Sequence, residues 1–372
     1  MPATSSRNAT QAIEGTRTMK FKFKHILLAT FTAINIICIM AMNICAYSSY
    51  LTPQTYPNWS YLGLLFPVFF VPNVLFILFW LVFKRVFAFI PLAGILLCAW
   101  AVRAYYPINI THGAPDNAIK FMSYNAMSFS DNSKASWNDK DIIKYIRESN
   151  ADIVCLQEAG GLGKAIDIGA LEIDEYPYHS AEEKKGIACL SKYPILSNNN
   201  ISYSSESNSS YAVEILIGTD TVLVVNNHFE SYRLNSTDKE SYKELIKKPE
   251  EVNVEKSYDT LTDKLVAANA IRGPQVDSVA TFIEKNHHKY IIACGDFNES
   301  PISYSHHRLT QILNDAYTRS GNGPGLSYNR HGMYFRLDHI LISDNIESHK
   351  TVVDSSVDYS DHYPIYSYLT LK

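Results

Sequence analysis

The chain has 372 residues, which is room for two average domains. Its net charge of −4 conceals two unlike parts: residues 1–115 hold eight Lys/Arg and one acid, and the rest holds 25 basic and 36 acidic residues, a net of −11. An acidic domain repels polyanions unless bound metal offsets its charge, which argues against a nucleic-acid-binding protein that relies on a basic surface.

Three apolar stretches without a charged residue follow a polar tail at residues 1–25. We expect transmembrane helices at about 26–46, 61–83 and 86–102, because a membrane-spanning helix needs roughly 20 apolar residues. A cleaved signal peptide would explain one such stretch and not three. The front of the chain is therefore predicted to be a three-helix membrane anchor.

The placement of Lys and Arg predicts how these helices are oriented. Lys20, Lys22 and Lys24 precede the first stretch, Lys84-Arg85 links the second and third, and residues 47–60 carry no charge. By the positive-inside rule, the tail and the Lys84-Arg85 link are cytoplasmic. Three crossings then place everything after Arg103 on the periplasmic or extracellular side. The sequence thus predicts an integral membrane protein whose partner is the lipid bilayer; it indicates no protein partner.

A linker at 103–117, containing Pro107, Gly113 and Pro115, leads into the predicted catalytic domain at 118–372. In this domain short β-type runs alternate with helical stretches. About nine strands with few helices predict two packed β-sheets with helices outside. Residues 231–269 are polar and helix-prone, and form an insertion that is either a lid over the substrate or a passive surface element.

Each apolar run of this domain ends in polar residues of a restricted kind. Strand ends that meet at one edge of a sheet place their side chains on a rigid scaffold. The segments at these ends are Asn125, Gln157-Glu158, Asn226-Asn227-His228, Gly295-Asp296-Phe297-Asn298, Asp338-His339 and Asp361-His362.

Carboxylates and amides without thiols are the ligands of a hard cation such as Mg²⁺ or Mn²⁺. Imidazoles beside them suit proton transfer and contact with a phosphate. Together these residue types predict metal-assisted attack of water on phosphorus, and hence a hydrolase of phosphate esters.

In motif order and spacing the chain resembles the endonuclease/exonuclease/phosphatase superfamily, the DNase I-like proteins, over about residues 117–372. The segments that carry the resemblance are Ser123-Tyr124-Asn125, Leu156-Gln157-Glu158, 186–194, Asn227-His228-Phe229-Glu230, Gly295-Asp296-Phe297-Asn298, 337–341 and 360–364. The resemblance implies a four-layer α/β sandwich of two packed mixed β-sheets flanked by helices, here preceded by the transmembrane segment.

The resemblance also implies the metal ligands. Glu158 is the main ligand, and Asn125 and Asp361 complete or neighbour the metal shell. The metal implied is Mg²⁺ or Mn²⁺.

The remaining roles concern water, phosphate and protons. By the resemblance, Asp296 orients or deprotonates the attacking water, and Asn298 and His228 hold the phosphoryl oxygens. His362 contacts the phosphate or moves a proton, oriented by Asp338. A carboxylate that accepts the N–H of a ring fixes its tautomer, so we expect Asp338 within about 3.2 Å of a His362 nitrogen.

Two positions allow more than one interpretation. Residues 182–185 hold no Tyr where certain nucleases of the family place one, which disfavours a DNase-like leaving-group acid. Lys184 or Lys185 contacts a phosphate, or the stretch is a solvated hairpin tip. Arg272 matches a position that is often basic in the family, and we interpret it as a structural ion-pair partner.

Three functions are therefore compared. The first is a membrane-anchored, metal-dependent phosphodiesterase or phosphatase that acts on a lipid headgroup or a small phosphate ester. An endonuclease or exonuclease acting on DNA or RNA is the first alternative, and the acidic balance weighs against it. A catalytically inactive binding module is the second, and the presence of Glu158, Asp296 and His362 opposes it.

Overall fold

The chain forms two compact units, and each is described by itself. The first comprises Met1–Ala46 and Leu65–Ala99, and the second Tyr47–Leu64 and Trp100–Lys372. The computed structural model describes residues 3–110, 113–131, 136–137, 139–160, 173–205, 208–247, 254–328, 330 and 332–372.

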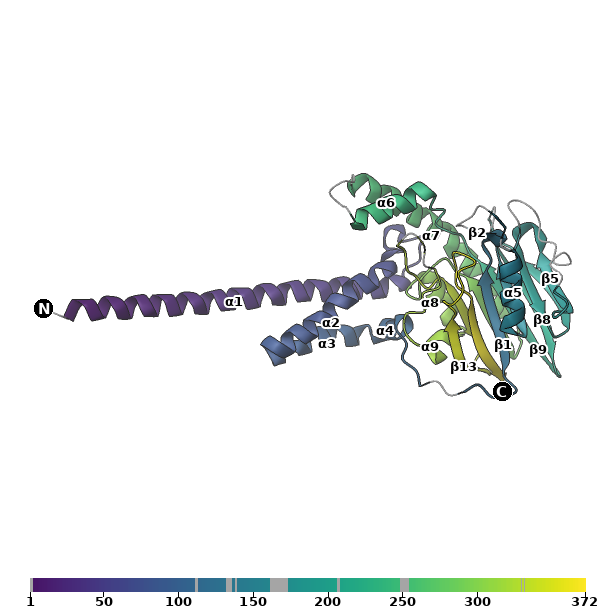
Figure 1. Ribbon diagram of the computed structural model, residues 1–372, viewed down its shortest axis with the longest axis horizontal. Helices are drawn as coiled ribbons and strands as arrows, with labels where there is room; N and C mark the ends of the chain where they lie inside the picture. Colours follow the sequence, from purple (N-terminus) through teal and green to yellow (C-terminus); the bar gives the residue numbers. More distant parts are fainter. Residues whose placement is uncertain are drawn as a thin grey trace. The chain divides into compact units, whose positions relative to one another are not determined.

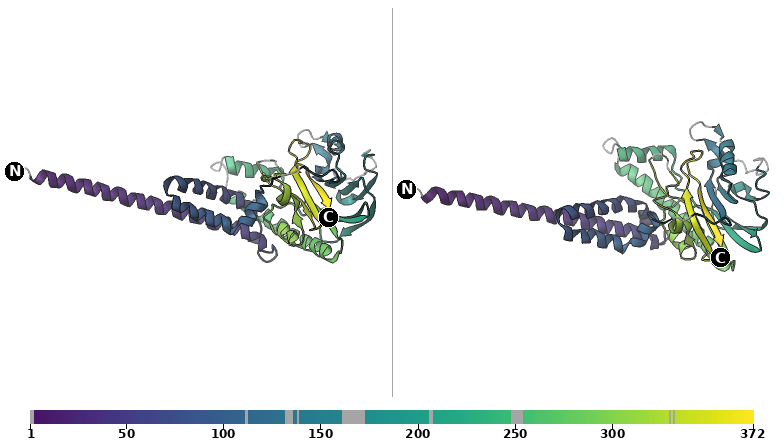
Figure 2. Two further views of the ribbon diagram at one scale, coloured as in Figure 1. Left: turned by 90° about the horizontal axis from the view of Figure 1, so that it is seen from below. Right: turned by 60° about the horizontal axis from the view of Figure 1, so that its bottom comes forward.

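The first unit consists of apolar helices tied by buried amides. Asn35 donates to Asn73 Oδ1 at 3.2 Å and accepts from the Trp80 indole at 3.1 Å, and Asn43 donates to the carbonyl of Gly94 at 3.1 Å. Such side chains bring polar partners together where no water can satisfy them. The helices that they join, which lie side by side in Figure 2, are α1 (Ala3–Tyr47), α2 (Phe66–Phe83) and α3 (Phe89–Leu97).

Two of the described helical segments are long and apolar enough to cross a membrane, Phe23–Tyr50 and Pro57–Phe83. They match the first two predicted spans. The third predicted span differs, because the chain breaks at Cys98 between α3 and α4 (Ala99–Tyr105). Cys98 has φ −122° and ψ 30°, outside the helical region, so this stretch is two helical pieces bent by 71° rather than one continuous helix, which is the form of a broken span or of a re-entrant loop.

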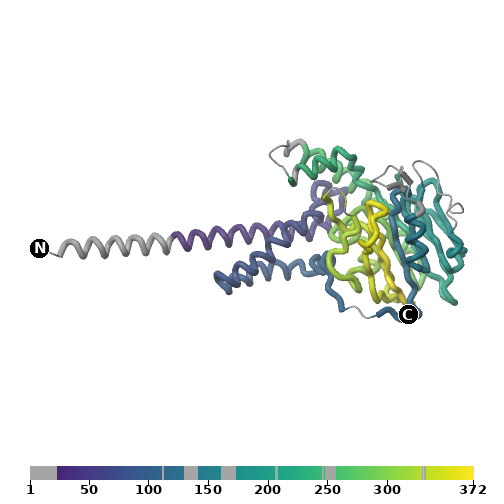
Figure 3. The backbone as a smooth tube through the Cα atoms, in the orientation of Figure 1, coloured from purple at the N-terminus to yellow at the C-terminus, as the bar shows by residue number. Residues whose placement is uncertain are grey.

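The second unit contains two six-stranded mixed sheets. In the first sheet, β1 is parallel to β4 and antiparallel to β14, so the last strand of the chain lies beside the first of the domain, as Figure 3 shows in yellow and blue. The strand order is β13 (Ile346–Val353), β14 (Ile365–Leu371), β1 (Ile119–Asn125), β4 (Ile153–Gln157), β6 (Ile187–Ser191), β5 (Tyr178–Glu182).

The second sheet repeats this plan. Its parallel pair is β9 and β10, and β12 is antiparallel to β10. The strand order is β11 (Asn314–Asp315), β12 (Asp338–Ile342), β10 (Tyr290–Asp296), β9 (Asp220–His228), β8 (Ser209–Ile217), β7 (Ile195–Ile201). The short strands β2 (Ser130–Asp131) and β3 (Ser136–Trp137) pair separately.

Helices cover the outer faces of both sheets. One apolar cluster lies between the sheets, a second joins the first sheet to α5 (Asp139–Ser149), and a third joins the second sheet to α7 (Val254–Lys285) and α8 (Tyr304–Thr310) (Figure 1). The other helices are α6 (Ser236–Lys247) and α9 (Ala316–Ser320). The predicted four-layer sandwich of two mixed sheets flanked by helices is confirmed.

The segment Tyr47–Leu64, which connects the first two apolar helices, belongs to the same compact unit as the sandwich. Asn269 of α7 donates to Ser60 Oγ at 2.9 Å and accepts from Arg272 at 2.7 Å. Arg272 is fully buried and pairs with Glu299 at 3.0 Å, as predicted for a structural ion pair. The segment Tyr47–Leu64 therefore packs with the sandwich.

We expect Arg272→Met to destabilise the protein by about 3–5 kcal/mol, because it leaves the buried Glu299 carboxylate without its partner. The measurement is urea unfolding of the full chain in detergent. Arg147→Met is the control, since its 3.3 Å pair with Glu175 is half-exposed and should contribute less than about 1 kcal/mol. Equal destabilisation by the two changes would contradict the interpretation.

Candidate active site

The polar residues predicted at strand ends meet at one rim of the sandwich. Asn125 and Gln157 are paired at the ends of parallel strands β1 and β4, and His228 and Asp296 are paired at the ends of parallel strands β9 and β10. Asp338 opens the antiparallel strand β12 opposite Asp296, and residues 361–362 precede antiparallel β14. Strand direction thus brings residues up to 240 positions apart to one place.

Two buried amides fix the two rims against each other. Gln157 of the first sheet donates to Asn226 Oδ1 of the second at 2.6 Å. The Asn226 amide in turn donates to the carbonyls of Leu156 and Ala188 at 3.0 and 2.9 Å. Because buried amides require partners, these bonds favour one relative position of the sheets. Sequence reasoning gave neither residue this role.

Glu158, His228 and Asp296 form one acidic group at the rim. One ligand atom from each lies within 4.8 Å of the others. His228 Nε2 is 3.4 Å from Glu158 Oε1, and the amide nitrogen of Asn125 donates to Glu158 at 3.1 Å and to Asp296 at 3.0 Å. The Asn125 oxygen instead accepts from Met127 N, so ligation of a metal by that oxygen requires the amide to turn over.

Asp338 and His362 form the predicted pair. His362 Nδ1 lies 2.7 Å from Asp338 Oδ2, and its Nε2 lies 3.7 Å from Asp296 Oδ2; all three side chains are buried. Burial alone would lower the pKa of His362, but the negative charges of Asp338, Asp296 and Asp361 outweigh it and raise the pKa well above its usual value. The raised pKa favours a protonated ring, whose Nε2–H would be directed toward Asp296.

The carboxylates of the site fit a divalent cation. Burial raises the pKa of Asp361, and repulsion from Glu158 and Asp296 adds to the rise. The pKa of Asp296 is raised by burial and by Asp338. Crowded carboxylates whose pKa values rise in this way are stabilised by a bound cation. Oxygen ligands dominate the group, which favours Mg²⁺ or Mn²⁺.

Asn298 and Lys185, both predicted to contact the phosphate, make hydrogen bonds to other parts of the chain in the structure. Asn298 lies next to Asp296, to whose Oδ1 its backbone N–H donates at 2.8 Å, and its side chain donates to the Phe229 carbonyl at 2.9 Å. Lys185 donates to the Ser205 carbonyl at 3.2 Å. The phosphate contacts of both remain predictions.

Two residues near the rim carried no motif in the sequence. The Tyr328 ring lies 5.2 Å from the His362 ring, edge-on. Lys239, from the first turns of α6, lies 5.7 Å over the Tyr328 ring, and its charge offsets part of the rise that burial causes in the pKa of Asp361. The insertion at 231–269 therefore brings a cation toward the acidic rim.

The sequence model described as "Endonuclease/Exonuclease/phosphatase family" matches residues 122–362, which is more than half of the chain. The chain belongs to the endonuclease/exonuclease/phosphatase family. A second model, described only as a domain of unknown function, matches residues 26–105. No curated protein matches the chain.

Several solved structures are similar to this family member. One is humanized D. rerio TDP2 with 14 mutations, with 14% identity, a TM-score of 0.49, and coverage of 68% of this chain and 99% of that chain. Another is the human Nocturnin catalytic domain with bound sulfate anion, with 15% identity, a TM-score of 0.47, and coverage of 70% of this chain and 97% of that chain. A third is an endonuclease/exonuclease/phosphatase family protein from Bacteroides thetaiotaomicron, with 14% identity, a TM-score of 0.49, and coverage of 70% of this chain and 100% of that chain.

We expect Asp338→Asn to lower turnover at neutral pH by at least about 10²-fold without weakening metal affinity. The folded pKa of His362 is raised, so the ring loses its proton only above the usual pH range, and activity that needs the proton falls there. Removing the Asp338 charge lowers that pKa and moves the alkaline limb of kcat/KM to lower pH.

The pH profile of kcat/KM and metal titration measure both effects. Asp344→Asn is the matched control, because its side chain is 89% exposed. An alkaline limb that stays in place in Asp338→Asn would show that His362 does not act through this pair.

Proposed function

We propose that this protein is a membrane-anchored, divalent-metal-dependent phosphoesterase that hydrolyses phosphate esters by attack of water. The observation that carries the proposal is the meeting of the Glu158–His228–Asp296 group and the Asp338–His362 pair at one rim. Family membership supports a hydrolase of phosphate esters and does not specify the substrate.

Glu158 and Asp361 would hold the cation, with the Asn125 amide beside them. When bound, the cation would neutralise the negative charge that develops on the phosphoryl oxygens. His228, 3.4 Å from Glu158, stands where its ring can contact a phosphoryl oxygen next to the cation.

Asp296 and His362 would divide the proton chemistry. Asp296 is buried and its pKa is raised, which makes its carboxylate a better acceptor for a proton from water. His362, protonated and held by Asp338, would donate a hydrogen bond from Nε2 to the phosphate. The side-chain amide of Asn125 and the backbone N–H of Asn298 each donate a hydrogen bond to the Asp296 carboxylate. These two bonds hold the carboxylate in place at the rim.

A phospholipid headgroup or a small phosphate ester is the substrate class that we favour over nucleic acid. Residues after position 115 carry a net charge of −11, without the excess of basic residues that a polynucleotide backbone requires. Lys239, beside Tyr328, brings a positive charge close enough to act on Asp361. Such a cation suits one additional phosphate or carboxylate group on a small substrate.

We expect Glu158→Gln to reduce metal-dependent turnover by orders of magnitude while the fold is retained, because the neutral amide is a poorer ligand for a hard cation. The assay is a screen of the full chain in detergent with Mg²⁺ and Mn²⁺ against phospholipids, small phosphate esters, RNA and DNA. Glu183→Gln, at an exposed position, is the control. Near-wild-type turnover in Glu158→Gln would sink the metal assignment, and preference for DNA or RNA would favour the nuclease alternative.

Two apolar helices support membrane anchoring. If the bent stretch Arg85–Tyr105 is a third crossing, the Lys and Arg residues around the helices support a catalytic domain outside the cytoplasm. We expect a reporter fused after Lys372 to be active only when it works outside the cytoplasm. Moving the positive charge, by Lys84→Ser with Arg85→Ser, should weaken this preference. A fusion active only in the cytoplasm would reverse the proposed topology.

A further inference from the structure

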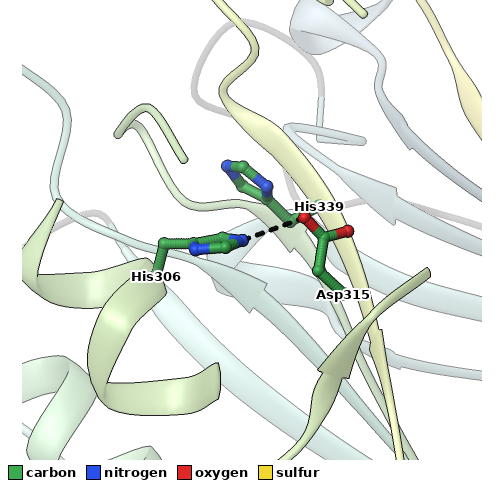
Figure 4. A group of neighbouring side chains, drawn as sticks. All are labelled: His306, Asp315 and His339. Carbon is green, nitrogen blue, oxygen red and sulfur yellow. Dashed lines mark hydrogen bonds and ion pairs between the residues drawn. The ribbon is translucent and has the colours of Figure 1, made fainter. Parts of the chain in front are cut away.

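A second cluster of metal-ligating side chains lies away from the rim, on the outer face of the second sheet. It consists of His306 from α8, Asp315 from β11 and His339 from β12 (Figure 4). All three are buried, and one ligand atom from each lies within 4.8 Å of the others. No role in the proposed hydrolysis uses any of them.

One ligand atom in this cluster is unused. His339 Nε2 lies 3.0 Å from the carbonyl of Glu299, which can only accept, so the ring proton sits on Nε2 and the lone pair on Nδ1. Nδ1 has no hydrogen-bond partner within the part of the chain that the structure describes, and His339 is 0% exposed. An imidazole whose other nitrogen donates to a backbone carbonyl is the usual arrangement of a metal-binding histidine.

The protonation states also suit a metal. Burial lowers the pKa of His339 well below its usual value, and the nearby His306 and Arg336 add to this, so the ring is neutral. Burial opposes ionisation of Asp315, but the hydrogen bond with His306 and the charge of Arg336 outweigh it and lower its pKa. A neutral imidazole and a carboxylate are the forms that bind metal.

We propose that His306, Asp315 and His339 bind a zinc-class cation, Zn²⁺ or Co²⁺, at a site separate from the catalytic one. Two imidazoles and one carboxylate are a zinc donor set, whereas the oxygen-rich rim favours Mg²⁺ or Mn²⁺. Ligand atoms about 2.0–2.1 Å from a tetrahedral ion lie about 3.3 Å apart. His306 Nε2 and Asp315 Oδ2 are 3.1 Å apart, which already fits.

Binding has a defined proton balance. A neutral His306 ring that donates from Nε2 to Asp315 Oδ2 carries its proton on Nδ1 once Nε2 ligates the ion, so no net proton is released; His339 already offers a lone pair. The fourth position of a tetrahedral ion is left to a water molecule. No oxidation or reduction is involved.

Arg336 is the group that opposes a cation here, at 3.9 Å from Asp315 Oδ2. The Arg336 guanidinium also has other partners: it stacks on the Tyr317 ring at 4.4 Å and donates to the carbonyls of Ala104 and Pro324. Asp315 Oδ2 also accepts from Thr318 at 2.8 Å. A metal-free hydrogen-bonded cluster is therefore the competing account, and the test below separates the two.

The site would hold three elements that lead to the active-site rim. His339 follows Asp338 in β12, and its Nε2 is bonded to the loop after Asp296 through Glu299. A cation at this place would tie α8 and β11 to the start of β12. The proposal rests on the buried cluster alone and stands whether or not the protein hydrolyses phosphate esters.

The test measures zinc bound to the full chain in detergent. The protein is stripped with a chelator, dialysed against Zn²⁺, freed of excess metal and analysed by mass spectrometry for zinc per chain. Glu158→Gln is the background, because it removes the main catalytic ligand. To it are added His306→Gln, His339→Gln, or the matched control His349→Gln, whose ring bonds to Thr370 elsewhere in the fold.

We expect about one Zn²⁺ per chain in Glu158→Gln and with His349→Gln, and at least about a tenfold weaker zinc affinity with His306→Gln or His339→Gln. Co²⁺ at the site should show the intense visible absorption of tetrahedral coordination, lost in the same two variants. Circular dichroism verifies folding, and if His339→Gln does not fold, His306→Gln decides. Background protein that binds no Zn²⁺, or zinc binding unchanged by His306→Gln, overturns the proposal and leaves the metal-free cluster.

Discussion

The candidate active site depends on the hydrogen bonds that Asn226 and Gln157 make across the two sheets. Apolar contact between two sheets is non-directional and permits sliding. The buried Asn226 amide prevents such sliding, because its N–H groups reach the carbonyls of Leu156 and Ala188 in only one relative position of the sheets. The same position brings Asn125 of the first sheet within 3.0 Å of Asp296 in the second. The candidate catalytic group is thus assembled with the help of a buried polar contact between the sheets.

That assembly concentrates negative charge at a place where burial makes charge costly. Asp296 and Asp338 are almost fully buried, and Glu158 and Asp361 lie close by. Within the chain, the protonated His362 and the N–H groups of Asn125 and Asn298 offset part of this charge. Under the proposed function, a divalent cation and the substrate would offset the remainder, and this need for a bound cation distinguishes such a site from a surface acidic cluster.

Much of the fold and site could be predicted because strand direction is readable. Each apolar run shows where a strand ends, and the family order of motifs says which ends share a rim, so the Asp338–His362 contact was predictable to within a hydrogen-bond length. Side-chain orientation was not: nothing in the sequence shows that the Asn125 amide turns its nitrogen to the carboxylates. Amide direction depends on neighbours that meet only in the folded chain.

Contacts between distant segments were beyond sequence reasoning for a related reason. Helix α7 begins at Val254, inside the insertion predicted at 231–269, and continues to Lys285, since sequence pattern does not show where packing on another segment extends a helix. Ser60, in an uncharged loop, carries no signal for its bond to Asn269. Tyr328 and Lys239 reach the rim from loops and an insertion whose polar composition is that of any solvated surface.

The start of β12 shows how one strand can serve two sites. Side chains alternate across a strand, so Asp338 lies on the same side as Ile340 and Ile342, which pack between the sheets, and His339 on the side of Leu341, which packs under the helices. Two adjacent residues are thereby committed to opposite faces. Whatever fixes His339 on the helical face also fixes the backbone from which Asp338 reaches His362. The outer cluster and the Asp338–His362 pair are therefore joined through a single peptide unit of β12, so any effect of one on the other would need no long relay of contacts.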